Sequence, residues 1–341
     1  MIFPEIIKLI VSLFVILAGA EFFTNSVEWL GRKLKLGDGA VGSVFAAVGT
    51  ALPETLIPVI AILSGDHGSD QHDIGIGAIL GAPFMLATLA LFVTGIAAVI
   101  KRRNNSQMNI IPDVMKRDMR FFMLVYAIAI LASFLPAWSM KVVAAGFLVF
   151  AYIFYVHKTI KNSKGKHDEE GEGLNPLYLM RKNPDPPFVL VLAQLAAALG
   201  IILVGAVIFV GSVQVVATFW GVPVLVLSLI ITPIATELPE KFNSIIWVSR
   251  GKDTLALGNI TGAMVFQSSL IPAIGILLTT WELEPVALLS AILALGAIFF
   301  QYICLSGKHG LKPSHLLCGV LFYLIFIGVL IYNSSSALFF A

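Results

Sequence analysis

Residues 19–54 read GAEFFTNSVEWLGRKLKLGDGAVGSVFAAVGTALPE, and residues 205–240 read GAVIFVGSVQVVATFWGVPVLVLSLIITPIATELPE. The two stretches align without a gap, and both end in Thr-x-Leu-Pro-Glu. A second pair of matching segments follows: GAILGA at 77–82 comes after the first stretch, and GNITGA at 258–263 comes after the second. Chance similarity between apolar helices does not place such a motif twice in one frame, so we infer that the chain contains an internal repeat.

The repeat lies in a chain that is too apolar to be a soluble domain. Of its 341 residues, 58% are hydrophobic and 12% are charged, and the mean hydropathy is +0.93. A helix crosses a bilayer with about 20 apolar residues, and runs of this length follow one another almost from end to end. We therefore predict an all-α integral membrane protein with ten transmembrane helices, at about 4–30, 38–63, 74–100, 119–135, 139–157, 187–217, 222–249, 254–280, 285–304 and 314–338.

One long polar segment divides the predicted spans into two groups of five. It includes KNSKGKHDEEGEG and RKNPDPP, which carry too few apolar residues to fold alone. The sequence thus predicts a first five-helix repeat at 1–157, a linker at 158–186 and a second five-helix repeat at 187–341. Because five is odd, the second repeat enters the membrane upside down relative to the first, which is the inverted architecture of secondary transporters.

The basic residues predict the orientation of the chain in the cell membrane. Connections on the cytoplasmic side of a membrane are enriched in Lys and Arg. Of the 22 Lys and Arg residues, 19 fall in alternate connections between the predicted spans, whereas Lys8 and Lys141 lie near the opposite side. We therefore expect the 158–186 linker to be cytoplasmic and both termini to be outside.

Two acidic residues, Glu54 and Glu240, fall near the middle of the second and seventh predicted spans. An ionised side chain at the centre of a membrane costs about 2.5 to 3.5 kcal/mol, so two of them call for a cation or a proton. Pro53 and Pro239 precede them, and proline leaves the carbonyl four residues earlier without its helical partner. The sequence therefore predicts that spans two and seven are broken helices that offer the carbonyls of Gly49 and Ala235 to an ion.

These groups suit Ca2+, which binds about 6 to 8 oxygen atoms in adaptable geometry. Two bidentate carboxylates supply four of the oxygens, and the hydroxyls of Thr50 and Thr236 with the two freed carbonyls supply the rest. The same acids also suit two protons or Na+ ions in exchange. The pattern thus favours antiport of a cation and leaves the coupling ion open. For Gly77, Gly81, Gly258 and Gly262 we favour a packing role, because small residues one turn apart let helices approach closely.

The motifs GTALPE and ATELPE, with GAILGA and GNITGA, resemble those of the cation/Ca2+ exchanger superfamily, and of its prokaryotic Na+/Ca2+ exchanger branch in particular. The resemblance covers nearly the whole chain. It implies a fold of ten helices in two inverted repeats, with Thr50, Glu54, Thr236 and Glu240 lining central ion sites. It also implies that access alternates as the first and sixth helices slide across the rest of the protein.

The chain departs from the family pattern, which resembles G-T-S-L-P-E followed by G-N-x-x-G-S-N. The motif serines fall on Ala51 and Glu237, and the later Asn or Asp ligands fall on Pro83 and Met264. Glu237 is therefore a third candidate ligand, and on a helix it shares a face with Glu240 and with Lys241. These departures give weight to H+ coupling or a changed substrate as the alternative to Na+ coupling.

We therefore predict a secondary active antiporter that exchanges Ca2+ for Na+, with an H+-coupled antiporter of Ca2+ or another cation as the alternative. An intramembrane acid or metal enzyme is a more distant alternative, because the chain has no motif such as H-E-x-x-H and an enzyme does not explain the repeat. A scaffold that has lost transport is a third. We expect the lipid bilayer and the transported ions as partners, with no cofactor, no nucleic acid and no required protein partner.

Overall fold

The computed structural model describes residues 2–33, 52–65, 70–101, 107–163, 175–181, 185–249, 251, 253–307 and 310–339. All the regular elements within these ranges are helical, which confirms the all-α class. The helices of the first half are α1 (Phe3–Lys33), α4 (Leu52–Ser64), α5 (Asp70–Met85), the π-helix η2 (Leu86–Ala90), α6 (Leu91–Lys101), α7 (Pro112–Leu131), the short 3-10 helix η3 (Ala132–Phe134) and α8 (Trp138–Ser163).

The second half follows a short 3-10 turn, η4 (Tyr178–Met180). Its helices are α9 (Phe188–Trp220), α10 (Val224–Ser249), α11 (Asp253–Leu278), α12 (Pro285–Ser306), α13 (Pro313–Leu317) and α14 (Gly319–Phe339). Seven helices of the described part are long and apolar enough to cross a membrane. The multi-pass membrane class is therefore supported, while the full set of ten spans stays a prediction.

Proline and glycine set several helix boundaries. Pro112 and Pro285 occupy the first positions of α7 and α12, where the missing N–H has no helical acceptor in any case. At the other end of α9, Gly221 takes a left-handed backbone with φ of 64°, a conformation that glycine adopts without strain. The chain then turns directly into α10.

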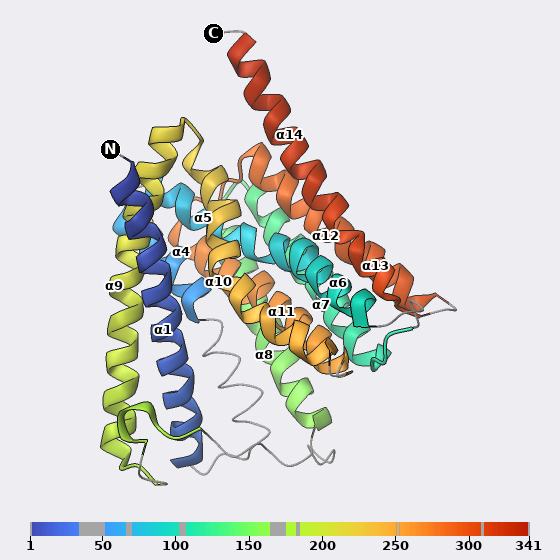
Figure 1. Ribbon diagram of the computed structural model, residues 1–341. Coiled ribbons are helices and arrows are strands. Elements are labelled where there is room, and N and C mark those ends of the chain that lie inside the picture. The colour runs from blue at the N-terminus through green and yellow to red at the C-terminus, as the bar shows by residue number, and fades with distance from the viewer. Residues whose placement is uncertain are drawn as a thin grey trace.

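Helices α1 and α9 lie side by side and form a pair at one edge of the bundle (Figure 1). A Cβ atom on Gly19 would lie 2.7 Å from Ile202 Cγ1, and one on Gly205 would lie 2.8 Å from Ile16 Cγ1. The shift that aligns Gly19 with Gly205 also aligns Ile16 with Ile202. The two contacts are therefore reciprocal, as in the packing of two copies of one element about a two-fold axis.

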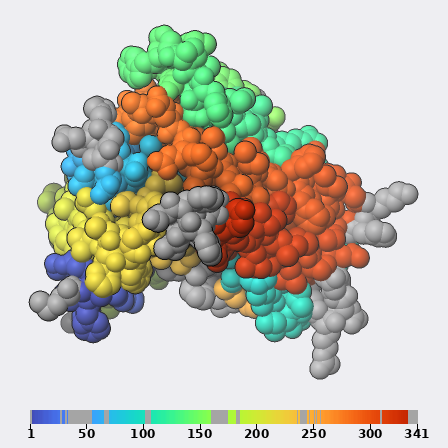
Figure 2. All heavy atoms as spheres, turned by 90° about the horizontal axis from the view of Figure 1, so that it is seen from above, coloured from blue at the N-terminus to red at the C-terminus, as the bar shows by residue number. Residues whose placement is uncertain are grey.

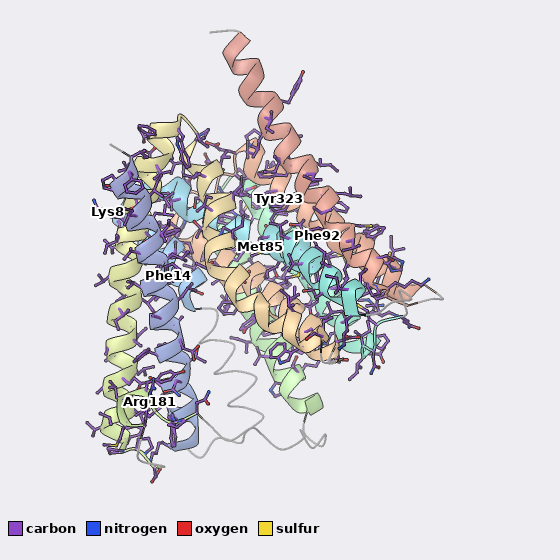
Figure 3. All side chains as sticks on the ribbon, viewed as in Figure 1. Lys8, Phe14, Met85, Phe92, Arg181 and Tyr323 are labelled. Carbon is purple, nitrogen blue, oxygen red and sulfur yellow. The ribbon has the colours of Figure 1, made fainter. Side chains whose placement is uncertain are left out.

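The predicted outer connections gather at one end of the bundle. The N-terminal end of α1, the α9–α10 turn and the C-terminal end of α14 lie at the same end (Figure 1). Seen from that end, the α7–α8 and α11–α12 connections are exposed beside the α9–α10 turn (Figure 2). Lys8 lies toward this end of α1, whereas Arg181 lies at the opposite end (Figure 3). The chain thus alternates between two ends, as the predicted spans require.

The end of the linker is attached to the α1–α9 pair by buried polar side chains. Gln194 of α9 is fully buried, and its Nε2 donates to Asn25 Oδ1 at 3.0 Å and to Ser26 Oγ at 2.9 Å on α1. Its Oε1 accepts the N–H of Leu179 at 2.9 Å. Trp29 Nε1 donates to the Asn175 carbonyl at 3.0 Å. Residues 175–181 therefore pack on both helices, although the linker as a whole is polar.

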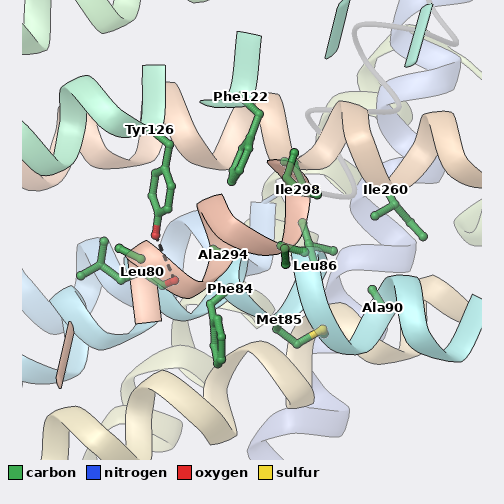
Figure 4. Close-up of a cluster of buried hydrophobic side chains, with 14 of the residues drawn as sticks. Leu80, Phe84, Met85, Leu86, Ala90, Phe122, Tyr126, Ile260, Ala294 and Ile298 are labelled. Atoms are coloured by element: carbon green, nitrogen blue, oxygen red, sulfur yellow. Dashed lines mark hydrogen bonds between the residues drawn. The ribbon is translucent and has the colours of Figure 1, made fainter. Parts of the chain in front are cut away.

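The largest core cluster lies among α5, η2, α7, α11, α12 and α14. Phe84, Leu86, Phe122 and Tyr126 are buried there (Figure 4). The Tyr126 hydroxyl donates to the Leu80 carbonyl at 3.4 Å, which satisfies its polar atom in an apolar setting. This cluster packs against α5 and α11, the helices that carry GAILGA and GNITGA.

The expectation that span seven is broken is wrong for the described backbone. Helix α10 runs without interruption from Val224 to Ser249, through both Pro233 and Pro239. A proline removes one backbone hydrogen bond, but membrane helices tolerate the loss where a neighbouring helix packs against the freed carbonyl. The Leu229 carbonyl, four residues before Pro233, lies directly against Gly81 of α5. The expected break in span two involves residues outside the described ranges.

Candidate cation-binding site

The structure describes two of the predicted site side chains fully. Thr236 and Glu237 lie on consecutive positions of α10, and both are completely buried. Glu54 lies in α4, and Ala235 and Glu240 lie in α10, but their side chains are outside the described part. Gly49 and Thr50 lie outside the described residues altogether. The convergence of Glu54 and Glu240 therefore stays a prediction.

Glu237 faces α11 rather than the lipid. Its Oε1 accepts a hydrogen bond from Nε2 of Gln267, and Gln267 is 1% exposed. An ionised carboxylate away from water is stable only when charged or polar groups compensate it. The contact therefore places a polar pair in the interior of the bundle. The pair joins α10, which carries the second Thr-x-Leu-Pro-Glu motif, to α11, which carries GNITGA.

The Thr236 hydroxyl donates to the Thr232 carbonyl of the same helix at 3.0 Å. A hydroxyl has one hydrogen to donate and two lone pairs that accept. With its hydrogen held by Thr232, the Thr236 oxygen keeps lone pairs for a cation. This geometry is compatible with the ligand role that the sequence predicts for Thr236.

The two positions where the family pattern has Asn or Asp ligands carry no side-chain oxygen here. Pro83 is buried in the last turn of α5, three residues before the π-helix η2, and Met264 is 1% exposed in α11. Gln267 lies one helical turn beyond Met264, and its amide is the polar group that reaches α10. The polar contact between α10 and α11 is thus formed one turn away from the expected ligand position.

Other polar residues of α11 serve packing. Ser268 and Ser269 donate to the Val265 carbonyl of their own helix, at 3.2 and 2.6 Å. Near the start of α11, Asn259 Nδ2 donates to Ser244 Oγ of α10 at 3.4 Å, and Ser244 Oγ donates to the Ala256 carbonyl at 3.2 Å. These bonds fix α10 against α11 on the linker side of Glu237.

Gly77 and Gly81 let α5 approach α10 closely. A Cβ on Gly77 would lie 2.7 Å from the Leu225 carbonyl oxygen, and one on Gly81 would lie 2.7 Å from Pro233 Cγ and still closer to the Leu229 carbonyl. Ser228, between these carbonyls, donates its hydroxyl to the Ile74 carbonyl at 2.7 Å. The packing role predicted for this glycine pair is confirmed. For Gly258 and Gly262 no described atom lies within 4 Å of the Cβ position, so the close contact predicted for that pair is not found in the described part of the chain.

We expect Gly81→Ala to destabilise the protein by about 1 to 3 kcal/mol, the usual penalty of overpacking. The added methyl group would meet a backbone carbonyl, which cannot rotate away as a side-chain end does. Thermal unfolding in detergent measures the effect. Gly211→Ala on α9 is the matched control, because no described atom lies within 4 Å of its Cβ position. A wild-type melting temperature for Gly81→Ala would contradict the close approach.

A family model described as sodium/calcium exchanger protein matches residues 5–160 and 190–334, which are most of the chain. The chain belongs to the sodium/calcium exchanger family. This exchanger is 25% identical over 298 residues to the inner membrane protein YrbG of Escherichia coli strain K12, with 87% of each chain covered. The resemblance to the cation/Ca2+ exchanger superfamily is confirmed, and the enzyme alternative is set aside because the family consists of transporters.

Two solved structures share the fold of this exchanger. The crystal structure of the H+/Ca2+ exchanger CAX matches with a TM-score of 0.77 at 17% identity, covering 96% of this chain and 82% of that one. The sodium-calcium exchanger NCX_Mj matches with a TM-score of 0.57 at 21% identity, covering 96% of this chain and 97% of that one. The two similar proteins are named for different counter-ions, so the fold does not identify the counter-ion of this exchanger.

Proposed function

We propose that this exchanger is a secondary active antiporter that moves Ca2+ against Na+ through one central site. The proposed ligands are the carboxylates of Glu54, Glu240 and Glu237, the hydroxyls of Thr50 and Thr236, and the carbonyls of Gly49 and Ala235. The observation that supports the proposal best is the fully buried Glu237, on α10 one turn before Glu240 and in contact with Gln267 of α11.

A buried carboxylate in a membrane helix has to be compensated. Its ionised form at the centre of a bilayer costs about 2.5 to 3.5 kcal/mol on the lenient insertion scale. A bound cation removes this cost. Two carboxylates match the charge of Ca2+, and carboxylate oxygens are ligands that Ca2+ prefers. Emptying the site on one side of the membrane then requires a replacement cation, which is the physical basis of exchange.

We further propose that the two halves are inverted repeats and that α1 and α9 move together during alternating access. The reciprocal contacts Gly19–Ile202 and Gly205–Ile16 support this view. Glycines at these contacts let the two helices approach closely, so that each Ile side chain packs against the other helix. The polar attachment of residues 175–181 to both α1 and α9 also favours their movement as one unit.

The proposed orientation has both termini outside and the 158–186 linker in the cytoplasm. It is supported by the uneven distribution of Lys and Arg along the sequence. In this orientation α5 runs inward and α11 runs outward. Glu237 is then reached from opposite sides in the two access states.

A second candidate for the counter-ion is H+, and Glu237 favours it. The family pattern has a serine at this position, so the chain gains a titratable carboxyl group while it loses oxygen ligands at Pro83 and Met264. A carboxyl group can release a proton when Ca2+ binds. Antiport of Ca2+ against H+ would then use the same residues.

Ca2+ flux in proteoliposomes tests the proposal and separates the two counter-ions. We expect Ca2+ uptake when the vesicles contain Na+ and the outside buffer contains choline in its place. A Ca2+-sensitive dye trapped inside the vesicles reports the uptake. A pH gradient without Na+ is the second arm, and protein-free liposomes are the control. Uptake driven by pH but not by Na+ would replace Na+ with H+ in the proposal. Absence of Ca2+ movement under both gradients, with folded protein, would refute Ca2+ antiport.

A further inference from the structure

A buried carboxylate that has no part in the proposed site lies at the start of α7. Asp118 is 3% exposed, although it falls at the edge of an apolar span. Its two oxygens accept hydrogen bonds from three different helices, and the contacts divide cleanly between the two oxygens.

The Oδ1 atom of Asp118 is bound on the side of α7 and α8. It accepts from the Tyr155 hydroxyl at 2.8 Å and from Arg117 Nε and Nη2 at 3.1 and 3.0 Å. The Arg117 guanidinium also lies over the Tyr155 ring, 5.2 Å from its centroid. Arg117 thus balances the charge of Asp118, as a buried acid requires.

The Oδ2 atom of Asp118 is bound on the side of α11. It accepts from Thr261 Oγ1 at 3.1 Å, and Thr261 is 1% exposed. Thr261 belongs to the GNITGA motif and lies three residues before Met264 and six before Gln267. Six helical residues span about 9 Å, so the bond to Asp118 anchors α11 close to its contact with Glu237.

This anchor is present in only one of the two repeats. The alignment of GAILGA with GNITGA places Leu80 opposite Thr261, and Leu80 has no polar side chain. Helix α11 packs against α7 and α8 and also against α10. A hydrogen bond between α7 and α11 therefore restrains how far α11 shifts along its axis and how it rotates. Both determine where Gln267 meets α10.

We propose that Asp118 is a positioning residue of the exchanger, which holds α11 through Thr261 so that Gln267 meets Glu237. The inference rests on the proposed function for its link to transport, but the position of α11 can be measured without transport. Two hydrogen bonds from Arg117 hold the carboxylate of Asp118 in place, so the single bond that Tyr155 adds to the same oxygen is not needed for its position. Thr261 transmits its position to α11.

The transport test compares two variants that each remove one donor from Asp118. We expect Thr261→Val to raise the half-saturating Ca2+ concentration about tenfold, the ratio for losing one hydrogen bond to a charged group. The maximal rate should change little, and Thr261→Ser should restore the wild-type value. Tyr155→Phe removes a donor on the α8 side and should leave the half-saturating concentration near wild type. If Thr261→Val and Tyr155→Phe raised the half-saturating Ca2+ concentration equally, the hydrogen bonds of Asp118 would serve only general packing and the proposal would be wrong.

A cross-linking test measures the position of α11 independently of Ca2+ transport. In a full-length chain with Cys304→Ser and Cys318→Ser, the pair Glu237→Cys and Gln267→Cys should form a disulfide readily under mild oxidation. Adding Thr261→Val should slow this reaction several-fold, whereas adding Tyr155→Phe should not. Unchanged cross-linking with Thr261→Val would overturn the inference. Missing Ca2+ flux in the wild type, with slowed cross-linking in Thr261→Val, would instead refute only the proposed function.

Discussion

Glu240→Gln is expected to abolish Ca2+ exchange while the chain stays folded, and Glu54→Gln is expected to do the same. Each change removes a negative charge and one carboxylate oxygen, yet it keeps the shape of the side chain and its capacity for hydrogen bonds. Ca2+ needs both the charge and the oxygens. Proteoliposome flux should therefore fall to the level of protein-free vesicles.

Stability gives the second readout of these two variants. A neutral amide needs no cation to offset its desolvation in the membrane interior, so the melting temperature in Ca2+-free detergent should rise slightly. Glu5→Gln is a suitable control, because Glu5 is at the start of α1 in a solvent-exposed pair with Lys8 at 2.7 Å. Ca2+ exchange that persists in both Glu54→Gln and Glu240→Gln would disprove the site assignment.

The positions of the helices could be predicted because the bilayer and a few special residues determine them. The span expected at 187–217 is α9, Phe188–Trp220, and the span expected at 285–304 is α12, Pro285–Ser306. The prediction worked because a membrane helix needs a known apolar length. Proline and glycine also have fixed positions at helix ends, as at Pro285 and Gly221.

The continuity of α10 could not be predicted from its prolines. The effect of Pro233 depends on what lies beside the freed Leu229 carbonyl, and in the fold that neighbour is Gly81, which is far away in sequence. The spacing of Gly77 and Gly81 predicts a close helix contact, but it does not show that this contact lies at the carbonyl freed by Pro233.

For the candidate site, the sequence predicts which residue types offer oxygen atoms better than it predicts which residues are in contact. The sequence identifies Glu237 as a third acid, but only the fold brings it into contact with Gln267. Asp118 was missed as an anchor, since it lies beside Arg117 at the edge of a span and looks like an ordinary interface charge. Its partner Thr261 is on a helix of the other half. No local pattern reports such a contact.

Glu237 is the residue through which we expect the counter-ion to be selected. Glu237→Ser restores the serine of the family pattern, removes a titratable group and leaves a smaller oxygen ligand facing Gln267. We expect the ratio of Na+-driven to pH-driven Ca2+ uptake to rise about tenfold, as for the loss of one interaction worth about 1.4 kcal/mol. The maximal rate of Ca2+ uptake should change less than this ratio.

Glu237→Gln separates charge from size at the same position. It keeps the volume but removes the charge, so any positive charge of Lys241 near the site is no longer compensated and cation binding weakens through repulsion. We expect a higher half-saturating Ca2+ concentration and little pH-driven uptake. Ser269→Ala is the matched control on α11, because its hydroxyl donates to the Val265 carbonyl of its own helix at 2.6 Å. Wild-type ratios of Na+-driven to pH-driven uptake in both Glu237→Ser and Glu237→Gln would exclude Glu237 from ion coupling and leave it as a packing contact between α10 and α11.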